Sequence, residues 1–252
     1  MDNLKKALVT GASEGIGRAF AKRLAGENYA VTAVARNEGR LKELLRELNS
    51  GVHSCLVADL STQEGVDKIY NELTANHYDL LINNAGMGIY SPFYKTDLPK
   101  LMSMMRLNCE AVITLAHAYL NKAKEGDALI NVSSALAFLP FPKAGLYAAT
   151  KAFVTSFSES LWFEQKERGI YVMGLCPGIT ATNFHKRSGG ADDKIPPRSM
   201  TQSPEKVVDT AMLELKKRRK PTVISSANKF GLSIMPRILT RKNLVSIMGK
   251  NT

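Results

Sequence analysis

The sequence predicts an α/β protein built on a doubly wound parallel sheet, and three observations support this fold class. Short apolar runs alternate with longer stretches of helical periodicity over most of the chain. Glycine-rich and polar stretches come directly after the apolar runs, where parallel strands end together at one edge of a sheet. The 252 residues, 44% of them hydrophobic and 23% charged, suffice for one large core rather than two small ones. We therefore expect a single domain over residues 1–252.

The first strand and the turn after it predict a phosphate-binding site. Ala7–Thr10 is a short apolar run, and the segment Gly11-Ala-Ser-Glu-Gly15-Ile-Gly17 separates it from a helical stripe that begins at Ala19. Glycines allow the backbone to approach a phosphate closely, and the start of a helix directs free N–H groups and its positive dipole end toward it. A tight turn without a ligand is the alternative interpretation.

The second strand indicates which dinucleotide the site prefers. Ala30–Ala35 is apolar and is followed by Arg36, with Arg40 one helical turn later. A basic side chain at this point accommodates the 2′-phosphate of NADP, whereas an acidic one holds the ribose hydroxyl of NAD. We therefore expect NADP. The alternative is that Arg36 only opens an amphipathic helix whose core residues are Leu41, Leu44, Leu45 and Leu48.

The rest of the chain continues the alternation of strands and helices. Strands are expected at His53–Ala58, Leu80–Ile82, Ala128–Val132 and Ile170–Cys176. Helices are expected at Val66–Leu73, from about Asp97 to Lys122, from Leu146 to about Arg168 and from Ser203 to about Arg219. The strands are followed by Asp59-Leu60, Asn83-Asn-Ala-Gly86, Ser133-Ser134 and the segment from Pro177 to Thr182. Ligands of parallel sheets bind at this edge, so these segments are candidates for a site.

Tyr147 and Lys151 form the main candidate for an acid/base pair. They stand four residues apart near the start of a predicted helix, so both side chains point from the same face. A fixed cation near a phenol favours the phenolate and lowers a pKa whose reference is roughly 10. This spacing also occurs by chance on solvated helix faces, so the pair alone decides nothing. Asn108, inside the helix predicted from Asp97, is the other unusual polar residue, because Asn is unfavourable there unless it lies on the surface or has a task.

Five motifs in register identify a family resemblance. Thr10-Gly11-x-x-x-Gly15-x-Gly17, Asn83-Asn-Ala-Gly86, Ser134 thirteen residues before Tyr147, Tyr147-x-x-x-Lys151 and Pro177-Gly-x-x-x-Thr182 resemble the motifs of the short-chain dehydrogenase/reductase family. The resemblance runs from about Lys6 to Thr182. It implies a Rossmann-type domain that transfers a hydride between a nicotinamide and a carbonyl or alcohol carbon. It also implies a substrate loop at 183–204. The basic C-terminal helical extension expected at 228–252 departs from the resemblance.

The resemblance assigns catalytic roles to four residues. Tyr147 would be the general acid/base, and Ser134 would donate a hydrogen bond to the same substrate oxygen. Lys151 would lower the pKa of Tyr147 and bind the nicotinamide ribose, and Asn108 would position a water behind Lys151. Ser133 is the less suitable serine, because adjacent residues at a strand end point to opposite faces.

The resemblance also assigns a set of cofactor-binding residues along the strand ends. The set is Gly11, Ser13, Gly15, Ile16 and Gly17 at the pyrophosphate, Arg36, Asp59 and Leu60 at the adenine end, Asn83, Ala85 and Gly86 beside the adenosine, Tyr147 and Lys151 at the ribose, and Pro177, Gly178, Ile179 and Thr182 over the nicotinamide. One position departs from the NADP-binding pattern: Glu14 lies in the glycine loop where some relatives that use NADP carry a basic residue.

The positive charge is concentrated at the C-terminus. Ten Lys and Arg and no Asp or Glu lie between Leu215 and Thr252, so the first 214 residues carry only +1 of the formal charge of +11. This distribution argues against a nucleic-acid-binding face. The tail also carries apolar residues, and Pro236 is expected to break or begin a helix there. The tail then packs over the substrate cleft or a second subunit of a homodimer, or it contacts anionic lipid or an acidic carrier.

Composition also indicates the compartment. The three cysteines are odd in number and far apart, which favours a reducing cytoplasm over a disulfide framework. We expect no transmembrane span, no secretory signal and no metal site. A cytoplasmic location is predicted, with membrane association through the tail as the alternative.

The sequence therefore predicts an enzyme, an NADP-dependent carbonyl reductase or alcohol dehydrogenase acting on a small, lipophilic molecule. One alternative is a 3-ketoacyl-thioester reductase, although this chain has Thr222–Ser225 and the basic tail where such enzymes have a glycine-rich segment that builds their tetramer. The other is a non-catalytic NADP-binding regulator. Regulators of that kind commonly lose the catalytic side chains, and all four are present here.

Overall fold

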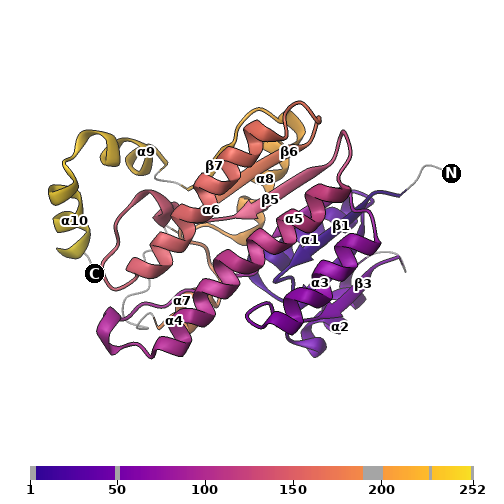
Figure 1. The fold of residues 1–252 in the computed structure, drawn as a ribbon, viewed down its shortest axis with the longest axis horizontal. Helices are drawn as coiled ribbons and strands as arrows, with labels where there is room; N and C mark the ends of the chain where they lie inside the picture. Colours follow the sequence, from indigo (N-terminus) through magenta and orange to yellow (C-terminus); the bar gives the residue numbers. More distant parts are fainter. Residues whose placement is uncertain (1–3, 49–51, 190–200, 227–228, 251–252) are drawn as a thin grey trace.

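A seven-stranded parallel sheet forms the centre of the protein (Figure 1). The computed structural model describes residues 4–48, 52–189, 201–226 and 229–250. The strands are β1 (Lys6–Thr10), β2 (Ala30–Ala35), β3 (Ser54–Val57), β4 (Leu80–Asn83), β5 (Ala128–Val132), β6 (Tyr171–Pro177) and β7 (Thr222–Ser225). Their order is β3-β2-β1-β4-β5-β6-β7, so the chain reverses direction across the sheet between β1 and β4. This confirms the predicted doubly wound fold, with β7 added beside the six strands that periodicity indicated.

Helices cover both faces of the sheet. They are α1 (Gly15–Gly26), α2 (Glu38–Glu47), α3 (Gln63–Ala75), α4 (Leu98–Met105), α5 (Ala111–Lys122), α6 (Gly145–Glu164), α7 (Phe184–Arg187), α8 (Pro204–Lys217), α9 (Lys229–Ile238) and α10 (Arg241–Lys250), with short turns η1 (Phe93–Lys95), η2 (Arg106–Glu110) and η3 (Ala135–Phe138). Strand residues alternate between two core clusters, as a pleated strand requires: Val9 joins α1, α2 and α8, whereas Leu8 joins α3 and α5. Both faces are therefore buried, which explains the continuous apolar strands.

The helix predicted from Asp97 to Lys122 is not a regular α-helix. A π-helical turn, η2, separates α4 from α5, and Asn108 lies within it. Its amide exchanges two hydrogen bonds with the backbone of Met87, which the strand β4 delivers to the same edge of the sheet. A widened turn of this kind is typical of functional sites in helices.

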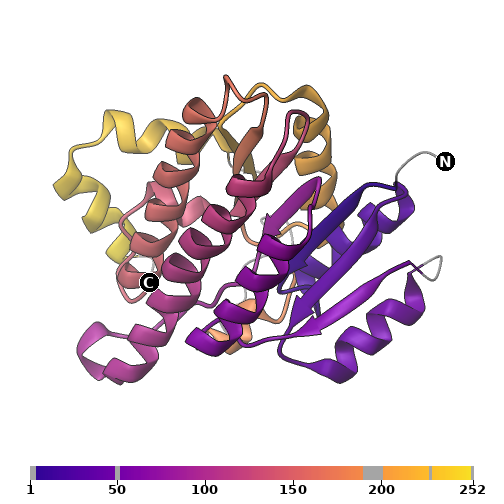
Figure 2. The same cartoon turned by 45° about the vertical axis from the view of Figure 1, so that its right-hand side comes forward.

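The C-terminal extension packs over the loop that follows β5. In Figures 1 and 2 the helices α9 and α10 lie at the opposite end of the molecule from the N-terminus, and α9 contacts η3. A Cβ placed on Gly249 of α10 would lie 3.5 Å from Cγ of Pro142, and Leu244 is fully buried. Pro236 lies inside α9, so the expectation that it breaks or begins a helix was wrong. The chain instead leaves the helical path after Ile238.

The predicted substrate loop 183–204 contains α7 and the start of α8, and its residues 190–200 lie outside the described part. Among the described residues, no helix has both the length and the apolar character needed to cross a bilayer.

Candidate active site

The first two turns of α6 bring Tyr147 and Lys151 together at the carboxyl ends of β5 and β6. Both side chains are buried, with 5% exposure each. The Lys151 Nζ lies 5.9 Å from the centroid of the Tyr147 ring and donates a 2.8 Å hydrogen bond to the carbonyl oxygen of Val132, the last residue of β5. The helix and the strand end thus hold the ammonium behind the phenol.

The two serines that follow β5 point in different directions. Ser134 hydrogen-bonds the Tyr147 side chain, and its hydroxyl also accepts from the backbone N–H of Leu136 at 3.2 Å. Ser133 instead donates to the carbonyl oxygen of Lys151 at 2.7 Å and lies 2.7 Å from the Thr155 hydroxyl. Because neighbouring residues of a strand alternate, only Ser134 faces the phenol.

Burial dominates the protonation of this pair. It raises the pKa of Tyr147 above that of an ordinary phenol, and the nearby Tyr90 adds to this, while the hydrogen bond with Ser134 acts in the opposite direction. Burial also lowers the pKa of Lys151 to about 8. The net direction for Tyr147 is therefore upward, because burial is the largest influence on the phenol, and the lowering of its pKa by the ammonium stays a prediction. Tyr147 keeps its proton at neutral pH, as a proton donor must.

Asn108 serves as an anchor for the segment that follows β4. Its Oδ1 accepts from the N–H of Met87 at 3.0 Å, and its Nδ2 donates to the Met87 carbonyl at 2.9 Å and to Thr150 Oγ1 at 3.0 Å. A Cβ placed on Gly86 would lie 3.3 Å from both Asn108 Oδ1 and Lys151 Nζ. Because Gly86 has no Cβ, this loop can pass close to the Asn108 amide and the Lys151 ammonium without a tight contact.

The glycine turn after β1 is tightly packed, and no side chain caps the start of α1. Gly11 and Gly15 have φ values of +66° and +55°, and a Cβ on Gly17 would lie 2.3 Å from the Gly11 carbonyl oxygen. Glu14, at the N-cap of α1, makes no side-chain hydrogen bond to the helix, so the first-turn N–H groups face outward for an anion. Thr10 Oγ1 accepts from the N–H groups of Asn84 and Ala85 at 2.9 and 3.0 Å, which ties the β4 loop to the turn.

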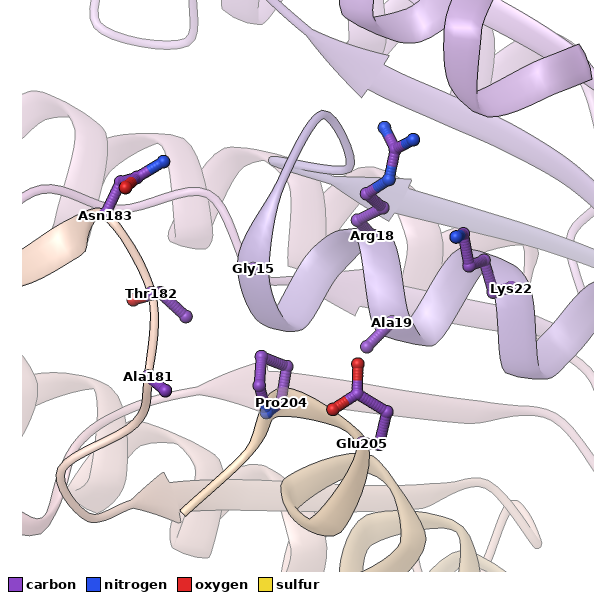
Figure 3. A pocket seen from close by; sticks show the side chains of 9 residues that line it. All are labelled: Gly15, Arg18, Ala19, Lys22, Ala181, Thr182, Asn183, Pro204 and Glu205. Carbon is purple, nitrogen blue, oxygen red and sulfur yellow. The ribbon is translucent and has the colours of Figure 1, made fainter. Parts of the chain in front are cut away.

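A cavity of about 520 Å³ opens beside this turn (Figure 3). Ala181, Thr182 and Asn183 lie opposite the start of α1, and the start of α8 forms its floor with Pro204 and Glu205. The cavity reaches Gly15 and Thr182 of the expected cofactor set. None of the four expected catalytic residues lines it.

Two arginines lie where the adenosine end of a dinucleotide is expected. Arg36 pairs with Asp59 at 3.6 Å, and Arg40 pairs with Glu14 at 2.9 Å. Burial acts to raise the pKa of Asp59, but hydrogen bonds from Ser61 and the charge of Arg36 hold it below its ordinary value. The carboxylate therefore remains ionised beside Arg36.

The other expected cofactor residues differ in accessibility. Leu60 is buried, whereas Ile179, after Pro177 and Gly178, is exposed. Ile16 packs against the core, and Ser13 is half-buried. Asn83 does not point at the glycine turn, since its Nδ2 donates to Asn131 Oδ1 at 3.0 Å. The amide of Asn84 reaches the turn instead, donating to the Thr10 carbonyl at 2.9 Å.

Sequence reasoning missed the side chains that cover Tyr147. The rings of Phe184 and Tyr90 lie 5.6 and 6.2 Å from the Tyr147 ring, and burial raises the pKa of Tyr90 to about 12. Phe184 comes from α7 and Tyr90 from the β4 loop, so no local pattern links either one to Tyr147. The cluster also contains Leu101 and Met104 of α4, which makes the surroundings of the phenol apolar.

A parallel sheet with a glycine turn at its switch point, and a buried Tyr–Lys–Ser group at the same edge, define a dinucleotide-dependent oxidoreductase class. The profile of the family described as short chain dehydrogenase matches residues 5–192. The chain belongs to this family of oxidoreductases.

Several relatives and solved structures resemble the chain. A very-long-chain 3-oxoacyl-CoA reductase of Anas platyrhynchos is 33% identical over 78% of this chain and 66% of its own length, so the chain spans about two thirds of that relative. Sulfoacetaldehyde reductase 2 of Chromohalobacter salexigens is 32% identical over 73% of this chain and 76% of its own. A short-chain dehydrogenase of Sphingobium yanoikuyae, solved with NADPH, superimposes with a TM-score of 0.83 at 29% identity over 96% of this chain and 95% of its own. The cofactor in that structure is the one that Arg36 indicated.

Proposed function

We propose that the protein transfers a hydride between NADP(H) and the carbonyl or hydroxyl carbon of a small, lipophilic substrate, with Tyr147 as the general acid/base. The observation that carries the proposal is the buried Tyr147 hydroxyl, hydrogen-bonded to Ser134 and backed by the Lys151 ammonium. A hydroxyl that keeps its proton at neutral pH, next to a second donor, suits the protonation of an alkoxide as it forms.

The residues fit the cofactor. The uncapped start of α1 and the positive-φ glycines Gly11 and Gly15 suit a pyrophosphate, and Arg36 with Arg40 suits a 2′-phosphate. Solved relatives contain NADPH or NADP. When bound, the nicotinamide supplies the hydride in reduction and accepts it in oxidation.

The chain's own groups handle the proton. In reduction, Tyr147 gives its proton to the substrate oxygen while Ser134 donates a hydrogen bond to the same oxygen. Lys151, protonated below pH about 8, stabilises the tyrosinate that remains. Asn108 holds Met87 and Gly86 beside the Lys151 ammonium, and its proposed role of positioning a water behind Lys151 stays a prediction.

The substrate class follows from the walls of the site. Apolar residues surround Tyr147, and a second cavity of about 260 Å³ adjoins them. Its lining combines apolar side chains, such as Ile89, Leu101 and Met104, with the polar Ser91, Thr96 and Lys143. A second candidate function is 3-oxoacyl-thioester reduction, because the relatives of Anas platyrhynchos and Mus musculus are very-long-chain 3-oxoacyl-CoA reductases. An acyl chain suits such walls.

A NADPH-oxidation screen tests both candidates. Purified protein is offered ketosteroids, aliphatic and aromatic aldehydes, quinones and 3-oxoacyl-CoA thioesters of increasing chain length, each with Tyr147→Phe as the control. Turnover that grows with chain length supports the thioester function. NADPH binding without turnover of any class in wild type would contradict the enzymatic proposal.

We propose a cytoplasmic location and a cleft-covering tail. Cys55, Cys109 and Cys176 are free, which supports a reducing compartment. Contact of α9 with η3 supports the tail as a cover beside the site. Lipid contact stays the alternative, since the exposed Ile238 and Val245 lie near Arg237 and Arg241. Co-sedimentation with anionic and neutral vesicles at low and high salt separates these, and light scattering tests the expected homodimer.

A further inference from the structure

The Glu14 carboxylate joins three segments that are far apart in the sequence. Glu14 is the last residue before α1, and its side chain is only 19% exposed. Its Oε2 accepts from Arg40 of α2 at 2.9 Å and from the amide of Asn183 at 3.4 Å. Its Oε1, shielded from solvent, forms an ion pair with Arg187 of α7. One carboxylate thus contacts α2, at the expected adenosine end of the site, and the segment of Asn183 and Arg187, at the substrate end.

The segment that Arg187 belongs to also covers the phenol. Phe184 lies 5.6 Å from the Tyr147 ring, and the N–H of Tyr90 donates to the Ser188 carbonyl at 2.7 Å. A Cβ on Gly88 would lie 2.9 Å from Phe184 Cζ, so α7 sits directly on the β4 loop. Figure 3 shows Asn183 and Thr182 opposite the start of α1. The segment 183–188 therefore contacts Glu14 on one side and Tyr147 on the other.

An acidic residue in a phosphate-binding turn needs an explanation, because its charge repels the ligand. The two guanidiniums provide it, since their charges offset that of the carboxylate with which they pair. They also share it. A 2′-phosphate at Arg36 and Arg40 competes for Arg40 with a doubly charged group, which an arginine fork prefers to one carboxylate. Glu14 is then left to Arg187 and Asn183 alone.

We propose that Glu14 is a positioning residue that links recognition of the 2′-phosphate to closure of α7 over Tyr147. The inference rests on the proposed use of NADP. A cofactor with the 2′-phosphate frees Glu14 from Arg40 and so strengthens its hold on α7, whereas one without it leaves Glu14 shared. By linkage, closure of α7 strengthens binding of the 2′-phosphate by the same factor.

The test compares hydrogen exchange of residues 183–189 with 2′,5′-ADP and with 5′-ADP, each at saturation, since these probes differ only in the 2′-phosphate. In wild type, 2′,5′-ADP should slow exchange about threefold more than 5′-ADP, the scale of one exposed ion pair. Glu14→Gln and Arg187→Gln should remove this difference. Lys186→Gln, which removes the same charge from the same helix, and Glu47→Gln, which takes one ion-pair partner from Arg18 and Lys22 instead, should keep it.

Affinities measured by calorimetry separate this inference from the cofactor proposal. Glu14→Gln should bind 2′,5′-ADP about threefold more tightly, because Arg40 is freed and the repulsion is gone, although α7 is held less well. If wild type binds both probes equally, the proposed use of NADP fails. If it prefers 2′,5′-ADP but residues 183–189 respond equally to both, or if Arg187→Gln keeps the difference, NADP stands and the role of Glu14 is refuted.

Discussion

Replacing Lys151 by Met should change the pH dependence of stability in a way that only a buried amine explains. Lys151 is 5% exposed, and burial lowers its pKa from 10.5 to about 8. A lowered pKa means that the unfolded chain binds the proton more strongly. Wild type therefore gains stability from this residue as the pH rises from about 8 toward 10.5.

The magnitude follows from the two pKa values. Keeping Lys151 charged and buried costs about 3 kcal/mol at pH 7 and about 1 kcal/mol at pH 9.5. Methionine removes this cost but leaves the Val132 carbonyl without its donor, a loss of about 1–3 kcal/mol. At pH 7 the variant should be as stable as wild type or up to about 2 kcal/mol more stable. At pH 9.5 that advantage should fall by about 2 kcal/mol, because the carbonyl term is the same at both pH values.

Urea unfolding, followed by the fluorescence of Trp162, the only tryptophan, measures the difference at both pH values. Groups that Lys151 does not influence titrate alike in the two proteins and cancel. The thiols of Cys109 and Cys176, whose pKa the Lys151 charge lowers, are the exception. A difference in unfolding free energy that is equal at pH 7 and pH 9.5 would refute the shifted pKa of Lys151. Turnover should be lost at both.

Three further substitutions test separate parts of the site. Tyr147→Phe should lower turnover by about 10²- to 10⁴-fold and leave the NADPH dissociation constant within about twofold; unchanged turnover removes Tyr147 as the acid. Arg36→Ala should weaken NADPH about tenfold and NADH hardly at all, and equal weakening in titrations of both would contradict the 2′-phosphate assignment. Asn108→Leu should lower the unfolding free energy by about 2–4 kcal/mol in urea, since it breaks three buried hydrogen bonds. A loss below about 1 kcal/mol would show that Met87 does not depend on the amide.

Local patterns sufficed for most of the sheet because its inner strands are buried on both faces. Ala30–Ala35 and Ala128–Val132 were predicted with the bounds that the structure has. β7 was harder to recognise as a strand, since only Val223 and Ile224 of its four residues are apolar. The π-helical turn at Asn108 was not predictable either, because its hydrogen-bond partner, Met87, comes from another segment.

Spacing also indicated which residues gather at the carboxyl edge. Tyr147 and Lys151 share a face because a helix repeats every 3.6 residues, and Ser133 and Ser134 diverge because a strand alternates. Asn83 was placed beside the cofactor by resemblance, yet its side chain binds Asn131. The choice between Asn83 and Asn84 depends on the backbone of β1, which no pattern in the β4 segment encodes.

The sequence by itself determined the doubly wound sheet, the glycine turn and the order of the residues at its edge, because these depend on local periodicity and spacing. Only the tertiary structure decided that burial raises the pKa of Tyr147, that Phe184 and Tyr90 cover the phenol, and that Glu14 is shared by Arg40 and Arg187. Desolvation and ion pairing depend on which distant segments come to lie together, and that is settled only when helices from both halves of the chain pack at one edge of the sheet.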